Sequence, residues 1–126
     1  MTLLRHIAAA ILIGGWLCPF AAAETLLLDI KQATSKIDEH SREPVIEVVL
    51  GDESARRVAD VTTKNIGAQA EIRIDGDAVL KPVIREPLLH GTFMISGRFS
   101  RQQADAIAKR LAAHTAKLEF VVQPAN

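Results

Sequence analysis

The sequence predicts an α+β domain of the ferredoxin-like βαββαβ type, in which one antiparallel sheet carries two helices on one face. Three observations lead to this prediction. Amphipathic helical patterns occur over residues 51–67 and 100–111. Short strand patterns precede and follow each of them. An Asp-Gly hairpin signal at residues 75–76 lies between the two strand-helix-strand units.

Residues 1–23 have the pattern of a secretory signal peptide. Arg5 and His6 are basic, residues 7–20 are almost entirely apolar, and residues 21–23 are alanines suited to a cleavage site. A membrane anchor is the alternative interpretation, but the apolar run is shorter than the roughly 20 residues needed to cross a bilayer. We therefore expect this segment to be removed on secretion.

The remaining chain, residues 24–126, is expected to form one small domain with a modest core. The whole chain has 15 Lys and Arg and 15 Asp and Glu. This balance argues against a nucleic-acid partner, which needs a concentrated basic face. The only cysteine, Cys18, falls in the leader, so the domain has no disulfide and no thiolate metal site. We expect it to begin at Glu24, to be periplasmic or secreted, and to contain no membrane span.

The first two strands are predicted from aliphatic runs. Residues 25–32 are aliphatic and then alternate, and residues 44–50 are rich in Val, Ile and Leu. The polar segment between them, residues 33–43, fits either a loop or a continuation of the first strand into a hairpin.

The first helix is predicted from small and apolar residues at helical spacing. Gly51 precedes the helix, and Lys64 lies in a basic last turn that is followed by Gly67. One buried face is expected, made of Ala55, Val58, Ala59, Thr62 and Ile66.

A hairpin and an irregular strand follow the first helix. Residues 70–74 alternate, and the turn at residues 75–76 leads into the short strand of residues 77–80. Pro82 and Pro87 then bracket a β-like segment. Because proline cannot donate to a sheet ladder, that segment should be irregular or lie at an edge.

Residues 92–96 are predicted to form a further strand, which Gly97 ends. Ser100 and Gln103 fit a capping box that starts the second helix. Residues 118–123 form the last predicted strand. The buried stripe of the second helix is expected to contain Ala104, Ile107, Ala108 and Leu111.

The sequence contains no pattern typical of a catalytic, cofactor or metal site. His40, His90 and His114 lie in three separate elements without ligand spacing. The acidic residues around Gly76 are explained by the turn, because the other ligands of a calcium loop are missing. We predict that the protein is not an enzyme and binds no cofactor.

The order of these motifs resembles the head of the first periplasmic domain of SecD, a subunit of the bacterial preprotein translocase. The resemblance covers the C-terminal two-thirds of the chain. The matching residues are Thr62, Asn65 and Gly67; Ile74, Asp75 and Gly76; Pro82, Val83, Ile84, Glu86 and Pro87; and Ile95, Ser96, Gly97, Phe99 and Ser100. The glycines and prolines among them set backbone geometry, so they indicate a fold and not a reaction.

The resemblance implies a function in protein export. It implies that residues 24–126 are a SecD head-like, non-enzymatic periplasmic module that contacts exported or membrane-associated polypeptides, with the Sec machinery as a partner. Two other classes remain open from the residues alone. One is a small-ligand-binding protein or enzyme, which would need a cleft with convergent His, Asp or Glu. The other is a structural subunit that self-associates through an exposed strand.

A partner is expected to dock along residues 92–96. The prolines at 82 and 87 limit pairing beside this strand, so part of its edge should stay open and accept an extended chain. The alternative is that the strand faces the core and that the N-terminal strand covers its edge. The residues predicted to bind a partner are Arg85, Phe93, Met94, Ile95 and Arg98.

Overall fold

The computed structural model describes residues 23–123. The predicted leader therefore lies outside the described residues except for Ala23, and its cleavage stays a prediction. The elements follow in the order β1 (Glu24–Leu28), β2 (Ile30–Ile37), β3 (Pro44–Leu50), α1 (Asp52–Lys64), β4 (Ala70–Ile74), β5 (Asp77–Leu80), β6 (Thr92–Ser96), α2 (Arg101–Ala112) and β7 (Leu118–Val122).

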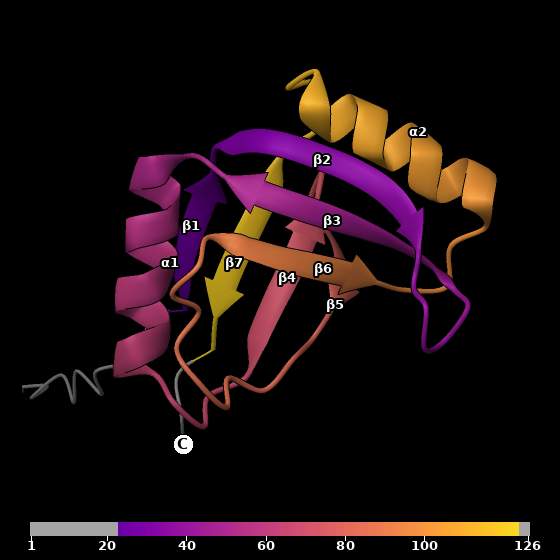
Figure 1. Cartoon of the computed structure of the whole chain (residues 1–126). Coiled ribbons are helices and arrows are strands. Elements are labelled where there is room, and N and C mark those ends of the chain that lie inside the picture. Colours follow the sequence, from indigo (N-terminus) through magenta and orange to yellow (C-terminus); the bar gives the residue numbers. More distant parts are fainter. Residues whose placement is uncertain (1–22, 124–126) are drawn as a thin grey trace, which may run out of the picture.

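The strands form two antiparallel sheets. The four-stranded sheet has the order β1-β7-β4-β5, and the three-stranded sheet has the order β2-β3-β6. The three-stranded sheet crosses the other, with α1 beside β1 and α2 above β2 (Figure 1). The prediction of antiparallel strands with two helices is confirmed. The prediction of a single, ferredoxin-like sheet is wrong.

The single-sheet prediction failed because each helix connects strands that belong to different sheets. α1 connects β3 to β4, and α2 connects β6 to β7, so each helix carries the chain from the three-stranded to the four-stranded sheet. A strand-helix-strand pattern in the sequence says nothing about which strands pair. Apolar residues of both sheets and both helices fill one continuous core, in which Phe120, Ile46, Ile95, Leu111 and Leu118 are among the most deeply buried side chains.

A further change of sheet occurs at Asp29. The sequence predicted one strand over residues 25–32, but Asp29 divides this run into β1 and β2. Its N–H donates to Ser54 Oγ at 2.8 Å, and its carbonyl accepts a hydrogen bond from the Gly51 N–H at 2.9 Å. Both partners belong to the start of α1. The corner is therefore held in place, and the segments on either side of it join different sheets.

The two helices bury five of the nine residues that their spacing predicts, and Ala55, Ala59 and Ile107 are half-buried. Val58, Val61 and Thr62 of α1 are buried, whereas Ile66 is 50% exposed because it lies beyond the helix end at Lys64.

The capping box of α2 is confirmed. Ser100 Oγ accepts the Gln103 N–H at 3.1 Å, and Gln103 Oε1 accepts the Ser100 N–H at 2.9 Å. Ala104, Ala108 and Leu111 form the buried face of this helix. The small side chains allow close approach to the core.

Both predicted turn regions are now defined. Asp75 and Gly76 have φ values of 52° and 87°, the left-handed pair that a type I′ hairpin requires, so the Asp-Gly prediction is confirmed. Residues 33–37 continue β2 and pair with β3, so the strand alternative holds for that part of the open segment. Asp38 closes this hairpin by accepting hydrogen bonds from Ser41 Oγ and from backbone N–H groups.

The segment between β5 and β6 is irregular, as the prolines predict. Its only ladder contact within the described residues is an isolated bridge between Val83 and Gln69. Ile84 donates its N–H to Ala68 O at 2.8 Å and accepts the Gly67 N–H at 2.7 Å. These bonds draw the segment toward the start of β4 and away from β6.

Candidate functional site

An apolar groove lies between β5, β6 and residues 82–88. Its volume is about 260 Å³. We call it the β6 groove. Its inner wall is made of Ile72 and Leu80 from the β4–β5 hairpin, Phe93 from β6 and Phe120 from β7. Since both sheets contribute to it, the groove forms only when the two sheets pack together.

Charged and flexible side chains surround the mouth of the groove. Arg85 and Glu86 line it and are exposed, and Met94 is 52% exposed. Arg85 makes no ion pair with any residue in the described part of the chain. The mouth can therefore offer a free guanidinium group to a ligand, while the wall offers apolar surface.

The structure brings together three of the five residues predicted to bind a partner. Arg85, Phe93 and Met94 line the β6 groove. Ile95 is fully buried in the core, where it lies opposite Ile46 of β3. It therefore supports the strand and is not available to a partner.

Arg98 lies elsewhere. It lines a separate and more polar cleft of about 370 Å³ beyond the end of β6, together with Glu43 and Phe99. The strand of residues 92–96 thus separates the two predicted arginines.

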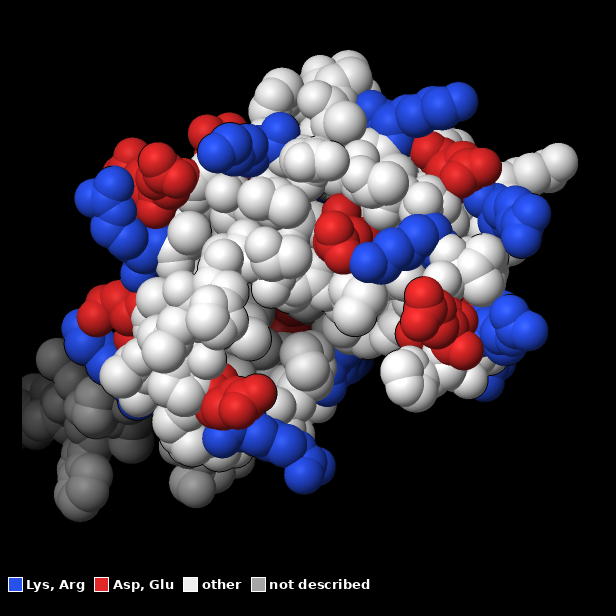
Figure 2. Space-filling view, viewed as in Figure 1, with Lys and Arg blue, Asp and Glu red and all other residues white. Residues whose placement is uncertain are grey.

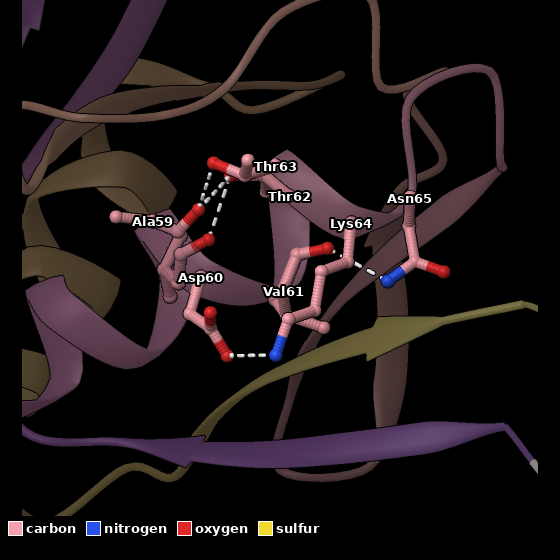
Figure 3. A network of polar contacts seen from close by, with 8 residues as sticks. Ala59, Asp60, Val61, Thr62, Thr63, Lys64 and Asn65 are labelled. Atoms are coloured by element: carbon pink, nitrogen blue, oxygen red, sulfur yellow. Dashed lines mark hydrogen bonds and ion pairs between the residues drawn. The ribbon is translucent and has the colours of Figure 1, made fainter.

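Thr62 supports the side of the groove that residues 82–88 form. Its hydroxyl donates to Val58 O at 2.7 Å and accepts the Leu88 N–H at 3.0 Å, while the side chain is fully buried. Next to it, Asn65 caps the end of α1 by donating to Val61 O at 2.7 Å (Figure 3). α1 therefore fixes the position of a loop that would otherwise have few anchors.

Sequence reasoning missed the inner wall of the groove. Ile72 and Phe120 are buried core residues and Leu80 is half-buried, and only the way in which the two sheets meet places them along a groove. Thr62 did carry a signal, since a hydroxyl at a core-facing helix position needs a partner when it is buried. That partner, the Leu88 N–H, is remote in sequence and was not predictable.

Asp75 and its partners form the clearest electrostatic contact outside the groove. Its carboxylate accepts the Lys117 N–H at 2.9 Å and pairs with the Arg110 guanidinium. These contacts, with the backbone hydrogen bond first, hold the pKa of Asp75 below its usual range. The carboxylate is thus engaged in joining the β4–β5 turn to the connection between α2 and β7.

The residues from 23 to 123 contain no group of three or more His, Cys, Asp or Glu side chains placed to hold a metal ion. On the face shown in Figure 2, acidic and basic side chains are interspersed and form no large patch of one sign. Within the same residues, neither helix is long and apolar enough to cross a membrane.

Comparison with known proteins gives consistent matches. Residues 28–115 match the family model described as SecDF, P1 head subdomain. The protein translocase subunit SecD of Dictyoglomus turgidum is 38% identical over 84 residues, which is 67% of this chain and 21% of that protein. SecD of Acidaminococcus fermentans is 32% identical over 95 residues, which is 74% of this chain and 22% of that protein.

Solved structures of SecDF show the same fold. One, described as a membrane component that enhances protein export, has a TM-score of 0.64 and 30% identity over 68% of this chain and 38% of that chain. SecDF in a super-membrane-facing form gives the same TM-score and identity over 11% of its length. The chain spans about a fifth of the length of the SecD relatives it matches.

Proposed function

The chain belongs to the SecDF P1 head family, and from this premise we propose that it is a non-enzymatic periplasmic module that binds polypeptide segments during protein export. The relatives are named as translocase subunits, and the solved SecDF is described as enhancing protein export. We further propose that residues 1–23 are removed on secretion and that the module acts together with the Sec machinery.

The β6 groove is the observation that carries the proposal. Its wall is apolar, its mouth is open to solvent, and its volume of about 260 Å³ is below the roughly 300 to 1,000 Å³ usual for small-molecule sites. A groove of this size suits one or two side chains of an unfolded polypeptide better than a cofactor. Non-polar side chains are what an unfolded chain exposes and a folded chain hides.

Binding to an unfolded chain tests the proposal. The protein would be expressed in ¹⁵N medium, recovered from the periplasm and titrated with a carboxymethylated, permanently unfolded model protein. We expect amide shifts to cluster around Val83, Phe93 and Met94. No binding at high concentration, or shifts confined to the two helices, would contradict the proposal.

A matched pair of variants locates the contact. Val83 lines the groove and is 49% exposed, whereas Leu89 lies on the same loop, is 64% exposed and does not line it. Val83→Glu should weaken binding of the unfolded protein, because it places a charge at an apolar contact. Leu89→Glu should leave it unchanged. Intact-mass measurement of the same periplasmic protein checks whether it begins at Glu24.

A further inference from the structure

The free edge of β6 has a defined register. β6 pairs only with β3 among the described strands, and Phe93 lies opposite Val48. The Leu50 N–H donates to Gly91 O at 2.8 Å, which makes these two residues a hydrogen-bonded pair of the ladder. Since such pairs alternate with non-bonded pairs, Phe93 and Ile95 direct their N–H and C=O groups toward β3.

The intervening residues therefore direct their backbone groups away from the sheet. These are Thr92, Met94 and Ser96, which are all exposed. Within residues 23–123, no hydrogen bond engages their outward N–H and C=O groups. A row of unpaired donors and acceptors on an exposed edge is a template for one more strand.

The sequence leaves this edge open for a physical reason. The segment that precedes β6 is the nearest candidate to pair with it, but Val83 bridges Gln69, and Ile84 bonds to Ala68 and Gly67. Pro82 has no N–H to offer a ladder. The backbone of residues 82–84 is thus bonded at the start of β4 and is not available to β6.

An added strand would direct the side chains of one face into the groove and those of the other face into solvent. In β6, Phe93 points to the inner side and forms part of the groove wall, while Met94 lies opposite Glu47, is exposed and lines the groove at its mouth. A chain hydrogen-bonded to β6 continues this alternation. Every second side chain would enter the apolar β6 groove, and the others would face solvent beside the ion pair of Lys36 and Glu47.

We propose that β6 receives an extended segment of an exported polypeptide as a fourth strand, with apolar side chains at alternate positions filling the β6 groove. The five residues of β6 set the length of the pairing. Strand addition explains how one surface would accept many sequences, because main-chain bonds supply affinity and the groove demands only apolarity. This inference rests on the proposed function and adds how the polypeptide is held.

Backbone N-methylation of a peptide tests the pairing without changing its side chains. The probe is a ten-residue peptide alternating Val or Leu with Thr or Lys, titrated into the full chain. Two derivatives carry N-methyl groups on alternate residues, one on the apolar set and one on the polar set. Strand addition predicts that one derivative loses binding and the other keeps it, since only one set of N–H groups faces β6.

The outcomes separate the two proposals. Binding that falls equally for both derivatives, or for neither, would overturn strand addition while leaving the groove as a polypeptide site. Failure of even the unmethylated peptide and of unfolded protein to bind would overturn the proposed function as well. Self-association of the protein that blocks peptide binding would show that a second copy occupies the edge, and would also overturn the inference.

Amide exchange of the protein gives an independent check. Peptide binding should slow exchange at Thr92, Met94 and Ser96, whose N–H groups gain partners. Phe93 and Ile95 are already bonded to β3 and should change little. Uniform protection along residues 92–96 would contradict the alternating pattern.

Two substitutions at one position separate backbone from side chain. Met94→Pro removes an outward N–H on an edge strand, where proline is tolerated, and should weaken binding about tenfold or more. Met94→Ala keeps that N–H and should weaken binding less. Equal losses in the two variants would overturn the inference. If Met94→Pro does not fold, the methylated peptides decide.

Discussion

The two outer strands of the three-stranded sheet differ in whether a helix packs along them. β2 has α2 packed along it, whereas β6 has no helix beside it and leaves its edge unpaired among the described residues (Figure 1). Proteins usually cover or disrupt such edges, because an exposed edge invites pairing with other chains. One sheet thus has a protected side, which stabilises the fold, and a receptive side.

Local sequence accounts for the difference. Ala104 and Ala108 are buried in α2 and bring that helix close to the sheet. Beside β6, Pro82 and Pro87 keep the preceding segment from forming a regular strand. A receptive edge therefore needs no special residue of its own. It needs a neighbouring segment whose backbone is committed elsewhere.

The largest effect is expected where the sheet is covered. Leu111→Ala removes a fully buried side chain of α2 and should lower the free energy of unfolding by about 2 to 5 kcal/mol. Met94→Ala at the open edge should change it by no more than about 0.5 kcal/mol, because that side chain is half exposed. Equilibrium denaturation in urea measures both. Similar losses at the two sites would break the comparison.

The next effect concerns the loop that borders the open edge. Thr62→Val leaves the Leu88 N–H without its acceptor and should cost about 1 to 3 kcal/mol of stability. Exchange of the Leu88 amide should become faster. Thr63→Val is the control, since Thr63 is exposed and its hydroxyl only bonds back to Ala59 O. If the two variants were equally stable, Thr62 would not anchor the loop.

A smaller effect is expected at the turn that carries β5 along the other side of the groove. Gly76 has a φ of 87°, and a Cβ there would meet no atom within 4 Å. Gly76→Val should therefore cost about 1 to 2 kcal/mol through backbone strain alone. Gly76→Asn should cost less, because asparagine tolerates this conformation better. An unchanged melting temperature for the valine variant would refute the turn geometry.

The smallest effect should appear only with pH. The pKa of Asp75 is lowered in the folded protein, so its carboxylate stabilises the fold above its ordinary pKa of about 4. That contribution is lost as the pH falls through the lowered value. The difference in free energy of unfolding between the protein and Asp75→Asn should thus narrow below about pH 4. A difference independent of pH would point to a role other than charge.

The sequence was informative wherever a few neighbouring residues determine the backbone. Asp75 and Gly76 predicted the turn, and Ser100 and Gln103 predicted the start of α2. Helical spacing predicted most of the buried residues of both helices. Ile66 was misplaced because helix ends are less well marked than helix interiors.

Contacts between residues that are far apart in the sequence could not be predicted from local patterns. The change of sheet at Asp29 depends on Ser54, and the position of the loop depends on the bond between Thr62 and Leu88. The sequence predicted that Arg85, Phe93 and Arg98 lie near one another. That Arg98 lies apart from the other two also depends on the packing of remote segments, which local patterns do not reveal.

The pairing of β1 with β7 has a mechanical consequence. Glu24 lies opposite Val122, so the chain enters and leaves the described fold through neighbouring strands at the same end of one ladder. Tension applied between these two points would load the ladder in a peeling direction, breaking its hydrogen bonds one after another and not all together. Such a ladder yields at lower force than one loaded in shear. A module pulled in this way would open from Glu24 inward, and the load would reach β2 through Asp29 only after β1 has separated from β7.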